Sequence, residues 1–328
     1  MKNKRKLLWI IGVLVIVFIS VQAGLDEIKA SLGQAEIEIL ILLFGLQLFT
    51  LALTSYQWFY LLNKDKKRIN FPDVFAIYLS GSLIESITPS SKLGGEAAKV
   101  YLFRKESGLS YEQLTGRLIA HKFIMLLPFL LLAIICLAFA SLEFNLPAFV
   151  YLAVLVFALL FGVFSYLNFK TWDNSNKPNG EKSLFLEKIM AGKEFLKRAI
   201  KSSQELLVKK ELIFLLMISF LVWGLYPVKL YLVSRMIGLS ASFWLVMIIT
   251  YAAYLVSMLP LTPGGLGTFE GSVALIFSLN GFVFAQGLSV ALLSRLITYW
   301  IPLIVSTLAA LYIISVKNFE VFSASGGR

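Results

Sequence analysis

The sequence predicts an all-α integral membrane protein with about seven full transmembrane helices and two broken, re-entrant helical hairpins. Three observations lead to this fold class. Of the 328 residues, 58% are hydrophobic and only 15% are charged, whereas about 25% of the residues of a soluble domain are charged. The mean hydropathy is +0.81. Apolar runs of roughly 20 residues, the length that a helix needs to cross hydrocarbon, recur along the chain.

The first two helices are predicted over about 7–23 and 37–62. The first follows four basic residues and so resembles the charged and apolar regions of a signal peptide. No clear small-x-small cleavage site follows it, and we expect a retained helix. The second ends at a cluster of Lys and Arg, at 64–68.

The next apolar segment, 71–103, is broken by the run Ser-Ile-Thr-Pro-Ser-Ser-Lys-Leu-Gly-Gly. Two unbroken helices are predicted after it, over about 117–140 and 147–169. Ser110 and Gln113 have the spacing of a capping box, which would start the first of these helices. These two polar residues therefore receive a purely structural interpretation.

A long polar stretch, 170–210, separates the two halves of the chain. Its apolar residues recur at helical spacing with basic residues between them, which predicts an amphipathic helix. Such a helix would lie on the membrane surface or pack on the protein itself. Further helices are predicted over about 211–233, 242–260, 268–282 and 288–316, with a second break at 259–267.

The whole chain, 1–328, is interpreted as one membrane domain. It divides into N-terminal helices at 1–70, a first repeat at 71–169, a cytoplasmic linker at 170–210 and a second repeat at 211–328. With the N- and C-termini in the cytoplasm, about 23 Lys and Arg residues lie in cytoplasmic stretches, as the positive-inside rule requires. The outer loops then hold only Lys29 and Arg235. We expect a multi-pass protein of the cell membrane.

The two broken segments align without a gap at an offset of 174 residues, the distance from Glu96 to Glu270. With the topology above, the first hairpin enters from the cytoplasm and the second from outside, so the two repeats would be inverted. Matching interrupted segments in two halves are typical of a transporter's binding site. The coincident landmarks are Thr88-Pro89 with Thr262-Pro263, Glu96 with Glu270, His121 with Arg295, and Pro128 with Pro302.

A break by Pro and Gly leaves backbone groups unpaired, which is tolerated at membrane depth only if protein buries them or a wet cavity receives them. The helices that restart near Gly94 and Gly267 would direct free N–H groups and the positive dipole end into the membrane, where an anion such as a phosphate headgroup would bind. Alternatively, Pro and Gly only kink a packed helix.

Ionisable residues within a membrane are costly, and they are usually paired or functional. We expect Glu270 to pair with Arg295. Glu96 would pair with His121 or Lys122, or instead with Lys92 or Lys99. These pairs would hold a substrate, or only staple the two halves together. Arg117 would neutralise a phosphate near the cytoplasmic surface or be an ordinary snorkelling residue.

The segments Thr88-Pro89-Ser90-Ser91-Lys92-Leu93-Gly94-Gly95-Glu96, with Arg117, and Leu261-Thr262-Pro263-Gly264-Gly265-Leu266-Gly267-Thr268-Phe269-Glu270, with Arg295, resemble the lysylphosphatidylglycerol synthase transmembrane family. This is the flippase-like membrane region of the multiple peptide resistance factor, which also occurs as stand-alone proteins. The resemblance covers nearly the whole chain. The first motif departs from the second, because Ser90-Ser91-Lys92 replaces the compact Gly pair.

The resemblance implies lipid translocation. In two-domain members, the membrane region moves aminoacylated phosphatidylglycerol to the outer leaflet, and a soluble domain transfers the amino acid from tRNA. This chain ends at Arg328, shortly after its last helix, so we do not expect phosphatidylglycerol lysyltransferase activity.

The leading hypothesis is a flippase-like transporter of an anionic or aminoacylated phospholipid, or of a polyprenyl-phosphate lipid. The alternatives are an accessory membrane subunit of a lipid- or glycan-modifying synthase or glycosyltransferase, and an enzyme that acts on a lipid with Glu96 and Glu270 as acids or bases. The predicted substrate-binding residues are Thr88, Pro89, Gly94, Gly95, Glu96, Arg117, Thr262, Pro263, Gly264, Gly265, Gly267, Glu270 and Arg295.

No catalytic residue, metal or cofactor is expected. A single His and a single Cys, Cys136, exclude a multi-His zinc site and an internal disulfide. No Gly-x-x-x-x-Gly-Lys-Ser/Thr loop is present for a nucleotide. The net charge of +11 is assigned to orientation in the membrane, and nucleic acid is not an expected partner.

Overall fold

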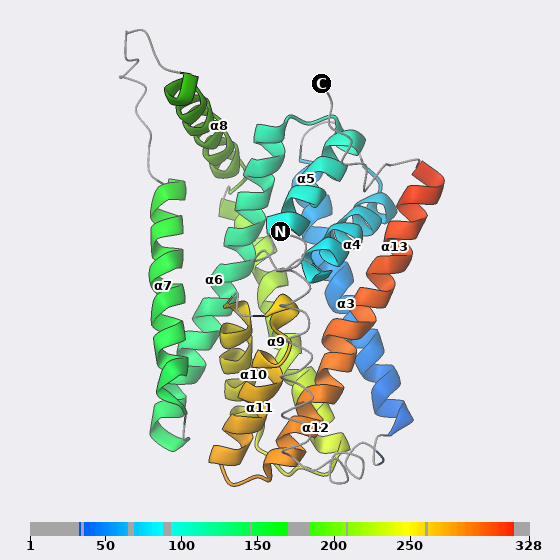
Figure 1. The fold of residues 1–328 in the computed structure, drawn as a ribbon, viewed down its shortest axis with the longest axis vertical. Helices are drawn as coiled ribbons and strands as arrows, with labels where there is room; N and C mark the ends of the chain where they lie inside the picture. Colours follow the sequence, from blue (N-terminus) through cyan, green and yellow to red (C-terminus); the bar gives the residue numbers. More distant parts are fainter. Residues whose placement is uncertain are drawn as a thin grey trace.

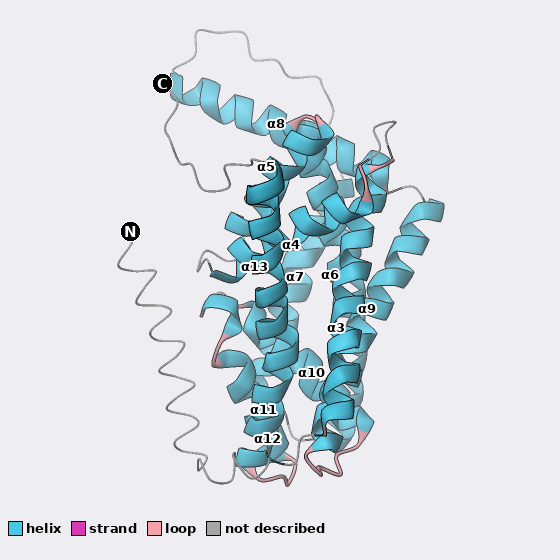
Figure 2. Ribbon diagram, turned by 90° about the vertical axis from the view of Figure 1, so that its right-hand side faces the viewer, coloured by secondary structure: helices cyan, strands magenta, loops and turns pink. Residues whose placement is uncertain are grey.

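A computed structural model describes residues 33, 36–64, 69–87, 93–144, 146–169, 184–207, 209–259 and 262–317. These residues form helices and their connections, without a strand among them (Figures 1 and 2). This confirms the all-α fold class. The helix predicted over about 7–23 lies outside the described residues, as do Lys29, Thr88, Pro89 and Lys92.

The helices follow one another along the described chain with short connections, except for the longer stretch before α8. Two short elements interrupt the second half. A 3₁₀ turn, η1 (Pro263–Gly265), precedes α11, and a π-helical turn, η2 (Leu296–Trp300), joins α12 to α13. The α-helices are α3 (Ile37–Leu62), α4 (Phe71–Ile87), α5 (Leu93–Ser107), α6 (Tyr111–Glu143), α7 (Ala148–Phe169), α8 (Leu184–Leu206), α9 (Lys209–Met236), α10 (Phe243–Met258), α11 (Thr268–Leu279), α12 (Phe284–Arg295) and α13 (Ile301–Lys317).

Five segments among the described residues are long and apolar enough to cross a membrane. The helix predicted over about 242–260, the first arm of the second broken segment, is α10, which has only 16 residues. At 1.5 Å per residue it measures roughly 24 Å, less than the hydrocarbon thickness of about 30 Å. The chain leaves the helix at Leu259, where the backbone is extended. The five segments are Ile37–Leu62, Tyr111–Ala140, Ala148–Tyr166, Lys210–Met236 and Phe284–Ser315.

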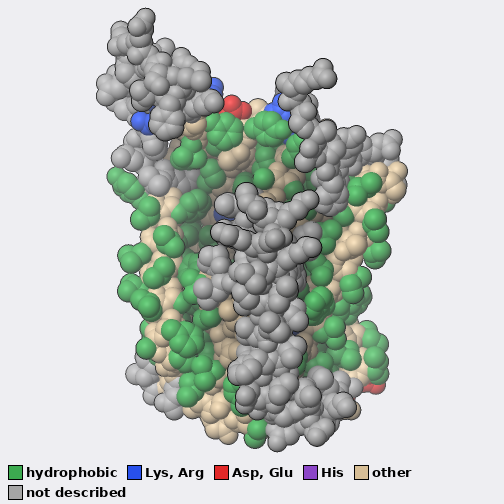
Figure 3. Space-filling view, viewed as in Figure 1, with side chains coloured by type: hydrophobic (Ala, Val, Ile, Leu, Met, Phe, Trp, Pro, Cys, Tyr) green, Lys and Arg blue, Asp and Glu red, His purple; other side chains and the backbone are tan. Residues whose placement is uncertain are grey.

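The sides of the molecule are apolar. In Figure 3, hydrophobic side chains cover most of the described surface along the helices, and the visible Lys and Arg side chains gather mainly toward the upper end. α7 illustrates this, because Leu152, Leu159 and Leu160 are each at least 60% exposed. A soluble protein would not present a belt of this size, whereas hydrocarbon solvates it.

The start of α6 and the packing of α8 agree with the local sequence. The Ser110 side chain accepts a hydrogen bond from the Gln113 N–H, and the Gln113 side chain accepts one from the Ser110 N–H, which confirms the capping box.

The amphipathic helix α8 packs against α6. At Gly116 of α6, a Cβ atom would lie 2.7 Å from the Ser202 Cβ of α8, so this crossing needs glycine. The described part of α8 therefore packs on the protein itself.

The helix bounds repeat at the offset of 174 residues. Shifted by this offset, α3 falls on residues 211–236, within α9, and α6 falls on 285–317, within the segment from α12 to α13. The hairpin α4–α5 falls on α10–α11 in the same way. α3 and α9 form such a pair although the predicted first repeat, 71–169, begins after α3.

The packing follows the same correspondence. α4 packs against α13 and α10 packs against α6, so each hairpin contacts the long segment that follows the other hairpin. In Figure 1, α4 and α5 lie in the upper half of the molecule, whereas α10 and α11 lie in the lower half. α3 and α9, which pack against each other, run in opposite directions.

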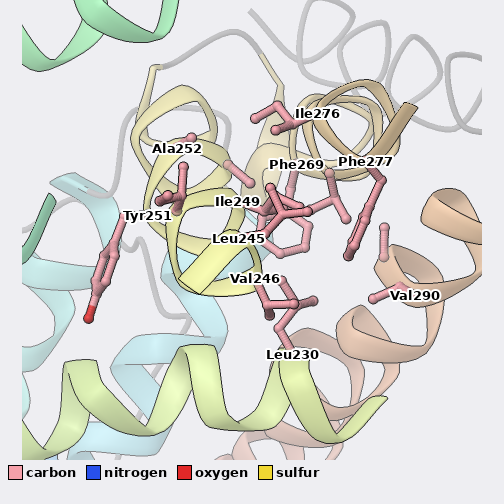
Figure 4. Close-up of a cluster of buried hydrophobic side chains, with 14 of the residues drawn as sticks. Leu230, Leu245, Val246, Ile249, Tyr251, Ala252, Phe269, Ile276, Phe277 and Val290 are labelled. Atoms are coloured by element: carbon pink, nitrogen blue, oxygen red, sulfur yellow. The ribbon is translucent and has the colours of Figure 1, made fainter. Parts of the chain in front are cut away.

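The second hairpin is anchored in the largest apolar cluster (Figure 4). Val246 and Ile249 of α10, Phe269 and Phe277 of α11, and Val290 of α12 are buried there together. Burying such a side chain contributes about 1.5–3 kcal/mol relative to exposure. This packing holds the break between α10 and α11 at a fixed place inside the bundle.

Candidate functional site

The break in the second hairpin is built from glycines with left-handed backbone. Gly264, Gly265 and Gly267 have φ angles of 61°, 69° and 81°, which side chains other than glycine's rarely adopt. Space is also limiting, because a Cβ at Gly264 would lie 2.5 Å from the Tyr299 ring. The Thr262 hydroxyl donates to the Leu266 carbonyl at 2.7 Å across this turn. The predicted glycines therefore shape a tight loop before α11.

Glu270 and Arg295 meet at this loop and form the predicted ion pair. Arg295 Nε lies 3.3 Å from Glu270 Oε1, and the two side chains are only 7% and 2% exposed. Arg295 Nη2 donates to the Gly265 carbonyl at 2.9 Å. Glu270 Oε2 accepts the Gly267 N–H at 2.7 Å. The carboxylate of Glu270 thus occupies the helix N-terminus where the sequence predicts an anion.

Aromatic rings complete the surroundings of Arg295. Its guanidinium carbon lies 4.3 Å from the centroid of the Phe269 ring and 5.5 Å from that of Tyr299, within the range of cation–π attraction. Tyr299 lies in η2, and π-helical turns are frequent at functional sites. Its hydroxyl donates to the Ser86 carbonyl at 3.4 Å. Tyr299 therefore connects the loop of the second hairpin to the end of α4 in the first.

The first hairpin holds its acid in a larger cluster of charges. Glu96 Oε1 lies 2.5 Å from Lys122 Nζ of α6 and 3.3 Å from Lys99 Nζ of its own helix. Lys99 Nζ also lies 3.1 Å from Glu85 Oε2 of α4. Two of the four partners expected for Glu96, Lys122 and Lys99, are confirmed. The cluster balances two carboxylates against two ammonium groups.

Close packing of α4 on α5 brings these charges together. A Cβ at Gly95 would lie 2.4 Å from the Glu85 Cβ and 2.7 Å from the Gly81 carbonyl oxygen. A Cβ at Gly81 would lie 2.2 Å from the Lys99 Cγ. Gly95 therefore acts as a contact surface between helices, and Gly94 lies half-buried beside it.

Arg117 and His121 lie outside the charge cluster around Glu96 and contact other residues. Arg117 is 1% exposed and donates from Nε to the Leu61 carbonyl at 3.0 Å and from Nη1 to the Gln113 carbonyl at 3.1 Å. Leu61 lies in the last turn of α3, where carbonyl groups have no partner within the helix. His121 packs on the Trp58 ring, with 5.1 Å between ring centroids, and forms no ion pair with Glu96 in the described structure. Arg117 is thus buried, unlike a snorkelling residue.

Among the described residues, eight buried side-chain atoms have no hydrogen-bond partner, and two of them belong to the charged groups described above. These two are Glu96 Oε2 on α5, in the first hairpin, and Arg295 Nε on α12, beside the second hairpin. The contact of Arg295 Nε with Glu270 is a charge contact only. Buried polar groups are nearly always hydrogen-bonded, so such exceptions point to a missing water, ion or ligand. The described residues contain no group of His, Cys, Asp and Glu that could hold a metal ion.

Sequence reasoning missed Glu85, Tyr299 and Lys229. Glu85 and Lys229 are charged residues within apolar segments, a signal that could have found them. Tyr299 had no such signal, because its place depends on the π-helical turn. Lys229 is 1% exposed and lies on α9, away from the residues predicted for the site.

Comparison with known proteins places this chain in a wider group. Residues 8–306 match the family described as "Lysylphosphatidylglycerol synthase TM region". A "UPF0104 membrane protein" of Methanothermobacter thermautotrophicus is 25% identical over 315 residues, covering 92% of this chain and 93% of the relative. Similar proteins with the same description occur in Pyrococcus horikoshii, 25% identical over 91% of this chain and 94% of the relative, and in Methanocaldococcus jannaschii, 27% identical over 95% of both.

Proposed function

This chain belongs to the lysylphosphatidylglycerol synthase TM region family, and we propose that it translocates an anionic or aminoacylated phospholipid, or a polyprenyl-phosphate lipid, between the leaflets of the cell membrane. The headgroup is held between the two hairpins, and the acyl or prenyl chains stay in the surrounding lipid. The apolar sides of the bundle allow this arrangement, because a chain can lie along them without entering water.

The proposal includes an inverted repeat. Helices α3 to α6 form one unit and helices α9 to α13 the other, with α4–α5 and α10–α11 as re-entrant hairpins from opposite sides. The matching helix bounds, the opposite directions of α3 and α9, and the placement of the hairpins in opposite halves support it. The end of the molecule with α8 then faces the cytoplasm, together with both termini. Transporters with this symmetry bind their substrate between the repeats.

The observation that carries the proposal is a pair of unsatisfied buried atoms, Glu96 Oε2 in the first hairpin and Arg295 Nε beside the second. Arg295 Nε–H is a donor and suits a phosphate oxygen. Glu96 Oε2 is an acceptor and suits a hydroxyl or ammonium group. A phospholipid headgroup offers both kinds of group on one small molecule. Tyr299, whose ring lies beside the loop of the second hairpin, contacts Ser86 at the end of α4, and we infer that one headgroup reaches both atoms.

Glu270 has a defined part in this mechanism. Its carboxylate already neutralises Arg295 and accepts the Gly267 N–H, and so it is the anion that a phosphate would replace. Exchange between carboxylate and phosphate avoids leaving Arg295 without a counter-charge, which would be costly inside the membrane. Loading and release of the lipid then follow movements of the Glu270 side chain.

Leaflet exchange of headgroup-labelled lipids in proteoliposomes tests the proposal. Wild type is compared with Glu270→Ala and Arg295→Ala, and with Glu194→Ala on the exposed surface of α8 as the matched control. We expect exchange by wild type and by the control. Loss of a charged hydrogen bond worth about 1.5–3 kcal/mol slows exchange by roughly tenfold or more in the two site variants.

Folding is checked for every variant by a monodisperse elution profile in detergent. Folded wild type that exchanges none of the labelled phospholipids or polyprenyl-phosphate lipids contradicts autonomous translocation. Site variants that exchange lipid as fast as wild type contradict the assignment of the second hairpin.

A further inference from the structure

Lys229 is a buried cation without a counter-ion. It is 1% exposed and lies on α9, one of the helices long and apolar enough to cross the membrane. None of the described carboxylates forms an ion pair with it. Lysines are rare at such depth, and they mark functional sites by default because a charge in hydrocarbon is costly.

The partners of Lys229 are neutral and come from α3 and α9. Its ammonium donates to Gln47 Oε1 at 2.6 Å and to Thr50 Oγ1 at 3.2 Å. The third N–H of the ammonium faces the Tyr226 ring, whose centroid is 4.1 Å from Nζ. Three N–H donors therefore meet two oxygens and one aromatic face, a complete set for the charged form.

The same partners also accept a neutral amine. Thr50 Oγ1 donates to the Leu46 carbonyl at 2.7 Å, so its hydroxyl is oriented independently of Lys229. The Gln47 amide can turn by half a rotation and present its NH₂ group to the amine lone pair. A lysine held by a carboxylate would be locked in the charged form, whereas this one has partners for both forms.

A chain of aromatic rings connects Lys229 to the second hairpin. The Tyr226 ring lies 4.9 Å from Tyr254, and Tyr254 lies 5.1 Å from Phe269, centroid to centroid. Phe269 lies under the guanidinium of Arg295. Both ends of this chain are cations on aromatic faces. A change of charge at Lys229 therefore alters the packing of rings that end at the Glu270–Arg295 pair.

Other ionisable groups on the helices packed against α9 are engaged elsewhere. Of those helices, α3 presents Gln47 and Thr50, α10 presents Tyr254 behind Tyr226, and α12 carries Arg295 at the far end of the ring chain. On α6, Arg117 binds the end of α3, His121 packs on Trp58, and Lys122 pairs with Glu96. No described acid is placed to hold the Lys229 proton.

The backbone next to Lys229 is interrupted. Pro227 has no N–H, so the Trp223 carbonyl one turn earlier lacks its usual helical partner. That carbonyl instead accepts the Tyr251 hydroxyl of α10 at 3.3 Å. The turn that carries Lys229 is thus joined to α10 by a side chain where a main-chain bond is missing, and it can move with the hairpin.

We propose that Lys229 is a proton-binding site that couples lipid translocation to a proton gradient across the membrane. The ammonium form ties α9 to α3 through Gln47 and Thr50, and release of the proton loosens this tie and the ring chain toward Arg295. The inference rests on the proposed function and names its energy source. It distinguishes a proton-driven transporter from a scramblase, which equalises the two leaflets whatever the gradient.

The test measures the steady-state distribution of headgroup-labelled phosphatidylglycerol in proteoliposomes of phosphatidylcholine and phosphatidylglycerol. The vesicles have equal pH on both sides or a difference of one pH unit, with valinomycin and potassium clamping the electrical potential at zero. One proton per lipid shifts the leaflet ratio by up to about tenfold per pH unit. We expect this shift for wild type only when the gradient is imposed.

Two substitutions and one control isolate Lys229. Lys229→Met cannot bind the proton and Lys229→Arg cannot release it, so we expect both to lose the shift. Lys229→Arg keeps the charge and the fold if Lys229→Met does not fold. Lys201→Met, on the exposed surface of α8, should behave as wild type. Retention of the shift by either folded Lys229 variant overturns the proposal.

The outcome for wild type separates this inference from the function on which it rests. Wild type that exchanges lipid to equal leaflets with and without the gradient overturns proton coupling and leaves translocation standing. Wild type that exchanges no lipid overturns translocation, and the coupling with it.

Discussion

The two hairpins carry an acid at the same place but hold it in different surroundings. Glu270 has one cationic partner, Arg295, and both side chains are nearly inaccessible, with backbone groups of the glycine loop as further partners. Glu96 pairs with Lys99, which also pairs with Glu85, and with Lys122, which is 35% exposed. The second site is closed and specified by backbone geometry, whereas the first is more open and made of flexible side chains.

The difference shows what the proposed repeat keeps and what it changes. The acid and the break before it occur in both halves, but the position of Arg295 corresponds to His121, which packs on Trp58. The base for Glu96 comes from the next residue, Lys122, and from its own helix. Both halves thus pair the buried acid with a basic side chain, but that side chain comes from a different position in each half. One rigid and one adaptable half would suit the proposed binding and release of a lipid headgroup.

Removal of the basic side chain from each site should give the largest difference between the two hairpins. Arg295→Ala leaves Glu270 buried without a counter-charge, and we expect the free energy of unfolding to fall by about 3–5 kcal/mol. Lys122→Ala leaves Glu96 with Lys99 and removes a partly exposed charge, which costs about 1 kcal/mol or less. Unfolding of both variants in detergent micelles, followed by circular dichroism, measures the difference. Equal losses would show that the two sites are equally closed.

Part of the stability that Arg295→Ala loses should be recovered by a second substitution. Glu270→Gln combined with Arg295→Ala removes both charges, so the double variant should be more stable than Arg295→Ala alone. The interaction free energy from the complete double-mutant cycle then isolates the pair. If the stability losses of the two single variants add up to that of the double variant, the 3.3 Å contact contributes no interaction free energy.

Packing at the α4–α5 crossing gives the next largest effect. Gly95→Ala introduces a Cβ that would lie 2.4 Å from the Glu85 Cβ, so α4 and α5 must separate at a cost of about 1–3 kcal/mol. The matched control is Gly162→Ala on α7, where nothing lies within 4 Å of the new Cβ. That control should be neutral or stabilising by up to about 1 kcal/mol, because alanine favours helix. Equal melting temperatures for the two variants would contradict the close crossing.

Much of this fold could be predicted from sequence because hydrocarbon imposes simple rules. Apolar length predicted the long helices, and the Ser110–Gln113 spacing predicted the start of α6. Charge within an apolar run predicted the Glu270–Arg295 pair. The Pro and Gly run at 259–267 predicted where α10 ends, within about two residues.

The rest of the site depends on contacts between distant segments. Whether Glu96 chooses His121, Lys122 or Lys99 is decided by the rotation of α6 against α5, and His121 lies against Trp58 of α3 instead. The role of Tyr299 depends on one residue of extra length in the π-helical turn. Lys229 was detectable as a charge in an apolar helix, but its neutral partners lie on α3, about 180 residues away in sequence.

The link between the two hairpins should have the smallest effect on stability. Tyr299→Phe removes the hydroxyl that donates to the Ser86 carbonyl at 3.4 Å and keeps the ring against Gly264 and Arg295. A hydrogen bond this long contributes at most about 0.5 kcal/mol, so the melting temperature should fall by no more than roughly 2 °C. Tyr312→Phe, on an exposed side chain of α13, is the matched control. If the headgroup must pass between the hairpins, lipid exchange should become faster in Tyr299→Phe and stay unchanged in Tyr312→Phe. Slower exchange at unaltered stability would instead mean that the hydroxyl contacts the headgroup, and that the closed half of the site includes η2.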